Sequence, residues 1–124
     1  MSTERREFER IPYEVVTDYR IYLQKTLKKE ELFYGKAQII NISGGGIQVR
    51  LQDVASDLLS DLLEKNKKLM LEFDVQIEDK TVTVYGKMIW AKEEGTTQAG
   101  ICFVDIDTEE RSKILHYIER QMSK

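Results

Sequence analysis

Apolar and polar residues alternate along most of this chain with the two-residue period of a β-strand. The clearest run covers residues 15–23, where Val15, Thr17 and Tyr19 belong to one set of alternate positions and Val16 to the other. Further strands are expected at residues 37–42, 47–51, 69–77, 81–90 and 96–104. Because these runs follow one another without the strand–helix–strand rhythm of a parallel sheet, the chain is predicted to form a small antiparallel barrel or sandwich.

Two helices complete this prediction. Leucines recur at helical spacing in residues 54–64, with aspartates on another face that we interpret as the solvated side rather than a metal site. Residues 107–123 begin with a polar cap and an acidic first turn and continue with an apolar stripe, which predicts a C-terminal helix that closes the barrel. Residues 24–34 are rich in Lys and Glu and are interpreted as a long loop or a short frayed helix.

Composition excludes several classes of protein. The 124 residues fit one domain, and 19 Lys+Arg against 22 Asp+Glu argue against a protein that holds duplex DNA by neutralising phosphates. No stretch reaches the roughly 18 apolar residues of a membrane span, and no apolar leader is present, so we expect a cytoplasmic protein without membrane insertion. Cys102, the only cysteine, is interpreted as a small thiol packed within a strand.

Two short motifs carry the chemical information. The first, Arg6-Glu7-Phe8-Glu9-Arg10, places two guanidinium groups four residues apart. An arginine fork can hydrogen-bond guanine through O6 and N7, bind a phosphate, or stack on a base. The second, Asn41-Ile42-Ser43-Gly44-Gly45-Gly46, places an amide and a hydroxyl two residues apart in a strand, hence on one face, before a glycine turn. Together the motifs predict a site for a ligand that carries guanines and phosphates.

These residues resemble the Arg-x-x-x-Arg and Asp/Asn-x-Ser-x-x-Gly motifs of PilZ domains, bacterial receptors for cyclic di-GMP, and weaker similarities at residues 84–90 and 100–103 extend the resemblance over nearly the whole chain. The resemblance implies a six-stranded antiparallel barrel with a short connecting helix and a C-terminal helix. It also implies that two arginines hold guanine and phosphate groups, that the amide and the hydroxyl take a guanine, and that a glycine keeps the turn in shape. The implied ligand-binding set is Arg5, Arg6, Arg10, Asn41, Ser43 and Gly46, in which Arg5 makes an extra contact.

The resemblance also implies a division of the chain. Residues 1–11 are expected to form a leader that ligand binding orders over the barrel, and residues 12–124 to form the barrel domain. The ordered leader would relay the signal to a downstream protein partner, which the sequence does not name. Glu4, Glu7 and Glu9 surround the arginines, which predicts a modest affinity for a dianionic ligand. The chain could be a monomer or a homodimer, and it could bind one nucleotide or a stacked pair.

Other functions have less support in the sequence. The glycines are followed by Ile47 rather than by the Lys-Ser/Thr of an NTPase loop, and His116, the only histidine, is interpreted as a surface residue of the C-terminal helix, so we expect no enzyme, no cofactor and no metal site. Two alternatives remain: a PilZ-like adaptor that does not bind the nucleotide, and a small barrel that binds single-stranded nucleic acid. Trp90 is interpreted as a packing residue rather than a ligand-facing one.

Overall fold

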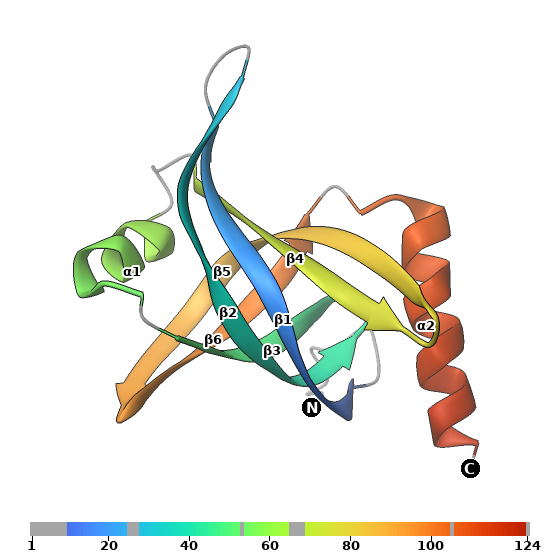
Figure 1. The fold of residues 1–124 in the computed structure, drawn as a ribbon. Coiled ribbons are helices and arrows are strands. Elements are labelled where there is room, and N and C mark those ends of the chain that lie inside the picture. Colours follow the sequence, from blue (N-terminus) through green and yellow to red (C-terminus); the bar gives the residue numbers. More distant parts are fainter. Residues whose placement is uncertain (1–9, 25–27, 53, 65–68, 105, 124) are drawn as a thin grey trace, which may run out of the picture.

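The computed structural model describes residues 10–24, 28–52, 54–64, 69–104 and 106–123. Its strands form a closed antiparallel barrel in the order β1-β2-β3-β6-β5-β4, in which β4 pairs with β1 (Figure 1). The strands are β1 Arg10–Gln24, β2 Lys29–Ser43, β3 Gly46–Leu51, β4 Leu69–Ile77, β5 Lys80–Glu94 and β6 Thr96–Val104. The predicted six-stranded barrel is therefore confirmed.

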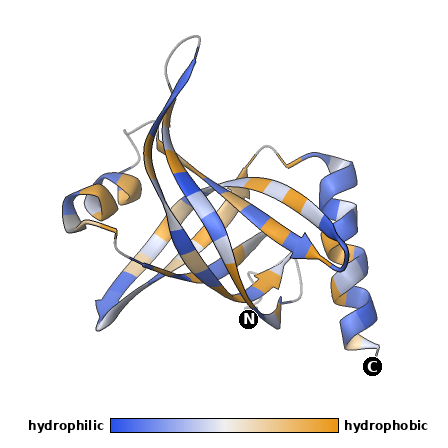
Figure 2. Cartoon of the chain, viewed as in Figure 1, coloured by the Kyte–Doolittle hydropathy of each residue, from blue (hydrophilic) through white to orange (hydrophobic). Residues whose placement is uncertain are grey.

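Side chains at alternate strand positions fill the barrel interior, and Figure 2 shows the corresponding alternation of hydrophobic and hydrophilic residues along the strands. In β4, Leu71, Phe73 and Val75 are fully buried, and the Phe73 ring stacks on Tyr19 of β1 with ring centroids 5.5 Å apart. Burying one such side chain stabilises the fold by about 1.5–3 kcal/mol. A slip of one residue between strands would expose a whole set of them, so the alternation fixes the register.

The two helices, α1 Ser56–Leu63 and α2 Thr108–Met122, match the predicted positions. Helix α1 buries Leu59 and Leu62 and contacts β4 and β5. Helix α2 begins after Asp107, whose carboxylate accepts a hydrogen bond of 2.8 Å from the Glu110 N–H and so caps the helix. It buries Ile114 against the barrel and contacts β1, β2 and β4.

The expectation of a loop or frayed helix at residues 24–34 is wrong wherever the structure describes that segment. Strand β2 begins at Lys29, and its first residues pair with the end of β1, for example Glu30 with Leu23 and Tyr34 with Arg20. A register irregularity after Ile21 breaks the alternation there. Residues 29–32 are all exposed, so a strand is compatible with their charged composition.

Two further positions refine the sequence interpretation. Cys102 is exposed rather than packed, because its neighbours Ile101 and Phe103 take the inward positions of β6. Strand β1 begins at Arg10 and places Ile11 in the core, so the expected boundary between residues 11 and 12 falls inside a strand. Among the described residues, no helix is long and apolar enough to span a membrane.

Candidate functional site

The glycine-rich turn between β2 and β3 is held by Ser43. Its Oγ accepts hydrogen bonds from the N–H groups of Gly45 and Gly46 at 3.1 and 3.2 Å, and it lies 3.4 Å from the Gly46 carbonyl, to which it donates. Ser43 is buried, and its hydrogen-bonding capacity is used within the turn. Ser43 therefore fixes the shape of the turn from which β3 departs.

Glycine is required at position 46 by close backbone packing. A Cβ at this position would lie 2.1 Å from the carbonyl oxygen of Ile101, which belongs to the neighbouring strand β6. The Phe103 N–H donates to the Gly45 carbonyl at 2.9 Å, and the Arg111 Nε–H of α2 donates to the Gly44 carbonyl at 3.2 Å. The turn is thus joined to β6 and to α2 as well as to its own strands.

Arg10 lies beside this turn. It is the first residue of β1, where it pairs with Ser43, and its Nη1 donates a hydrogen bond of 3.1 Å to Oδ1 of Asn41. A guanidinium of the first motif and the amide of the second, 31 residues apart in the sequence, are therefore in direct contact. Both side chains are partly buried, which makes the bond stronger than it would be at a fully exposed site.

Asn41 is the first member of a row of paired residues that crosses four strands of the barrel. Its Nδ2 donates to Oε1 of Gln48 at 2.8 Å, and Nε2 of Gln48 lies 3.5 Å from Oε1 of Gln98. In the strand register Asn41 pairs with Gln48, Gln48 with Gly100, and Gly100 with Trp90. The row runs from the arginine contact on β1 and β2 to the tryptophan on β5.

Trp90 packs along the outside of the barrel against Gly100 of β6. A Cβ on Gly100 would lie 2.2 Å from the indole Nε1, so the absence of a side chain at Gly100 lets the ring lie against β6. The residue as a whole remains 40% exposed. This exposed aromatic surface lies three strands from Asn41 in the row.

An open hollow of about 300 Å³ adjoins the contact between Arg10 and Asn41, and Ile11, Pro12, Glu14 and Ile40 also line it. This volume is at the lower end of the range for small-molecule sites, which is about 300 to 1,000 Å³. The hollow combines a guanidinium, an amide and a carboxylate with apolar surface. Such a set can hydrogen-bond the edge of a nucleobase and cover its flat face.

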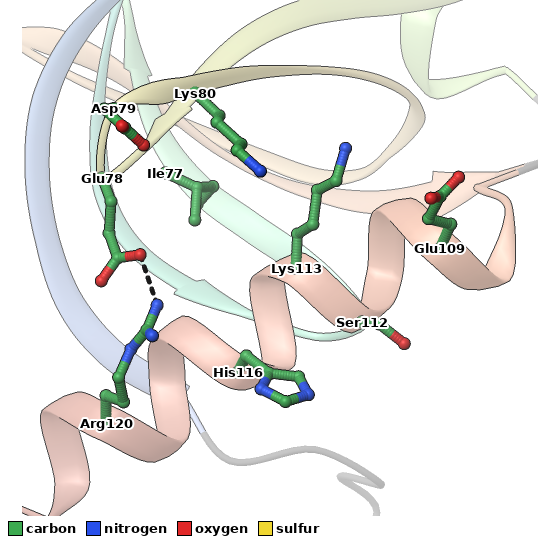
Figure 3. A pocket seen from close by; sticks show the side chains of 9 residues that line it. All are labelled: Ile77, Glu78, Asp79, Lys80, Glu109, Ser112, Lys113, His116 and Arg120. Atoms are coloured by element: carbon green, nitrogen blue, oxygen red, sulfur yellow. Dashed lines mark hydrogen bonds and ion pairs between the residues drawn. The ribbon is translucent and has the colours of Figure 1, made fainter.

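A second hollow, of about 430 Å³, lies between the β4–β5 turn and α2, and none of the motif residues lines it (Figure 3). Charges of both signs line it: Arg120 pairs with Glu78, Lys113 pairs with Glu110, and Asp79, Lys80 and Glu109 are further lining residues. His116, which also lines it, is an exposed helix residue, as expected. The mixture of signs does not define a site for an ion of either charge.

Tyr13 of β1 connects the barrel to α2. Its ring meets the edge of Tyr117 with centroids 5.6 Å apart. Burial, and to a smaller extent the neighbouring Tyr117 phenol, raises the pKa of Tyr13 to about 12. Burial therefore favours an uncharged Tyr13.

Four of the six predicted site residues are described, and the structure brings them together: Arg10, Asn41, Ser43 and Gly46. Arg5 and Arg6 lie outside the described residues. The sequence interpretation missed Gln48, although its outward position between Ile47 and Val49 could have indicated it. It also missed Arg111, which no local pattern connects to the turn. Within the described part of the chain, no group of three His, Cys, Asp or Glu residues could hold a metal ion.

Comparison with known proteins agrees with the fold. The family model for the PilZ domain matches residues 4–120. The fold is similar to that of the Bacillus subtilis inhibitor of motility MotI/DgrA, with a TM-score of 0.62 and 20% identity over 98% of this chain and 53% of that one. The chain thus spans about half the length of MotI.

A second solved structure, the PilZ domain of YcgR from Escherichia coli with cyclic di-GMP, has a TM-score of 0.61 and 15% identity over 96% of this chain and 95% of that one. At these identities the likeness establishes the fold. No curated protein is similar enough in sequence to count as a relative.

Proposed function

Because this chain belongs to the PilZ domain family, we propose that it is a cyclic di-GMP receptor whose ligand lies on the barrel face beside Arg10, Asn41 and the turn at residues 43–46. The observation that carries this proposal is the hydrogen bond between Arg10 and Asn41, which joins the two motifs at one place. The similarity of the fold to a PilZ domain solved with cyclic di-GMP supports it. PilZ domains are in general binding modules rather than enzymes, and we propose no catalytic role.

Each side chain of the site is suited by its chemistry to a different part of the ligand. Arg10 and Arg6 would bind guanine and phosphate groups, with Arg5 as an extra contact. Their guanidinium groups are positively charged and offer pairs of N–H hydrogen-bond donors. Asn41 would contact a guanine and hold Arg10 in place. Ser43 and Gly46 would act mainly by shaping the turn, since the Ser43 hydroxyl is already bonded within it.

Guanine also needs hydrogen-bond acceptors, because its N1–H and N2–H groups are donors. Glu14 lines the hollow beside Arg10 and Asn41, and its carboxylate can accept both. Adenine lacks this pair of donors. The hollow would therefore favour guanine over adenine, although the carboxylate also repels the phosphates of the ligand.

Ligand binding would order the N-terminal arginine segment over this face. Such ordering costs free energy, which keeps the affinity moderate, and it creates a surface that a partner protein could recognise. Hydrogen exchange measures this step directly: cyclic di-GMP should slow exchange at the amides of residues 4–10. Unchanged exchange at saturating ligand would exclude the ordering step while leaving the binding itself intact.

Isothermal titration of the protein with cyclic di-GMP, cyclic di-AMP and GTP tests the binding itself. We expect saturable binding of cyclic di-GMP alone. Arg10→Ala should weaken it by roughly 5- to 150-fold, since a bidentate arginine contact is worth about 1–3 kcal/mol. No binding at high ligand concentration would exclude the receptor function and leave an adaptor that acts through protein contacts.

A further inference from the structure

The orientation of the Asn41 amide follows from the chemistry of its neighbour. A guanidinium group only donates hydrogen bonds, so the atom of Asn41 that faces Arg10 must be the carbonyl Oδ1. The Nδ2 group of Asn41 then points the other way, along the sheet towards β3. The Nδ2 group therefore needs a hydrogen-bond acceptor at this position. Without one it would be an unsatisfied donor in a partly buried site, which costs free energy.

Gln48 supplies this acceptor. It lies directly opposite Asn41 in the register of β2 and β3, and its Oε1 accepts from Nδ2 of Asn41 at 2.8 Å. This bond turns Nε2 of Gln48 away from Asn41 and towards Oε1 of Gln98, 3.5 Å away on β6. The donors therefore all point in one direction, from Arg10 through Asn41 and Gln48 to Gln98.

We propose that Gln48 is a positioning residue of the nucleotide site: by accepting from Nδ2, it holds the Asn41 amide in the orientation that accepts from Arg10. The inference rests on the proposed function, since its effect is measured through cyclic di-GMP. Without an acceptor at position 48, Nδ2 of Asn41 loses its partner, and only the bond to Arg10 still holds the amide in this orientation. Ligand binding would then have to select the productive orientation, which weakens the affinity.

Three substitutions separate this role from a simple contribution to folding. Gln48→Leu keeps the size of the side chain but removes the acceptor, and it should weaken cyclic di-GMP binding by about 2- to 10-fold. Gln48→Glu keeps an acceptor towards Asn41 and should bind within about 3-fold of wild type, despite its added negative charge. Gln38→Leu is the matched control, because Gln38 is also a partly buried glutamine of the barrel surface but accepts from Arg50 instead. It should bind as wild type does.

The decisive measurement is a double-mutant cycle with Asn41→Ala, with affinities from titration calorimetry and folding verified by thermal unfolding. If Gln48 acts through Asn41, Gln48→Leu should have no further effect in the Asn41→Ala background. An equal loss in both backgrounds, or wild-type affinity of Gln48→Leu itself, would overturn the inference while the receptor function stands. A wild-type protein that does not bind would overturn the proposed function, and the inference with it.

Discussion

Replacing Gly46 by Ala tests whether the turn is fixed by backbone packing. The added Cβ would lie 2.1 Å from the Ile101 carbonyl oxygen, whereas a carbon and an oxygen in close contact are about 3.3 Å apart. Strand β3 must therefore withdraw from β6 by about 1 Å at the pair of Gly46 and Cys102. Overpacking of this kind costs about 1–3 kcal/mol, and a weakened ladder hydrogen bond adds about 1 kcal/mol, so we expect a loss of about 2–4 kcal/mol.

Urea denaturation measures this loss, with the fluorescence of Trp90, the only tryptophan, as the probe. Gly95→Ala is the matched control, because Gly95 has a positive φ of 75° but no atom within 4 Å of an added Cβ, so only backbone strain of about 1–2 kcal/mol should appear. Gly46→Ala should also weaken cyclic di-GMP binding, because it displaces the turn, whereas Gly95→Ala should not. A cost for Gly46→Ala no larger than that of the control would refute the packing argument.

Three further predictions concern single side chains. Ser43→Ala should weaken cyclic di-GMP binding less than Arg10→Ala in the same titration series, because hydrogen bonds of a neutral hydroxyl are worth roughly 1 kcal/mol each; the reverse order would make the turn, not the guanidinium, the main determinant of binding. Glu14→Gln should weaken cyclic di-GMP binding, because the amide replaces one of the two acceptor oxygens by an NH2 group that would face a guanine donor; tighter binding would show that repulsion of the phosphates dominates. The pKa of Tyr13 is raised to about 12 from 10.0, so the stability that it contributes is complete below pH 10 and is lost as the pH rises towards 12. Tyr13→Phe should therefore unfold at higher pH than wild type in an alkaline titration followed by circular dichroism, and an unchanged midpoint would mean that ionisation of Tyr13 does not limit alkaline stability.

Most of the barrel could be predicted because its strands obey a simple rule of alternation. In β4, the side chains of Leu71, Phe73 and Val75 face inwards and those between them face outwards, so local sequence and global fold agree. The rule failed at the start of β2, where Lys29 to Tyr34 pair with β1 but are almost all exposed. A strand without a buried face shows no alternation of hydrophobicity, so its composition resembled that of a loop.

The candidate site was predictable to the extent that its residues lie in short motifs. Asn41 and Ser43 were identified by their spacing, but the spacing did not show that the Ser43 hydroxyl bonds within the turn while the Asn41 amide bonds to Arg10 and Gln48. The contact of Arg111 with the turn depends on how α2 packs against the barrel. Contacts of this kind depend on tertiary packing and cannot be predicted from a local sequence pattern.

In the proposed receptor, the two arginines of the first motif hold cyclic di-GMP against the barrel. Titration calorimetry of Arg6→Ala/Arg10→Ala tests it most directly, with Lys80→Ala/Lys92→Ala as a control that removes the same positive charge from exposed positions outside the motifs. Wild type and the lysine variant should show saturable binding, and the arginine variant no measurable binding. Equal affinity of the two variants would contradict it, because the arginines would then contribute only net charge.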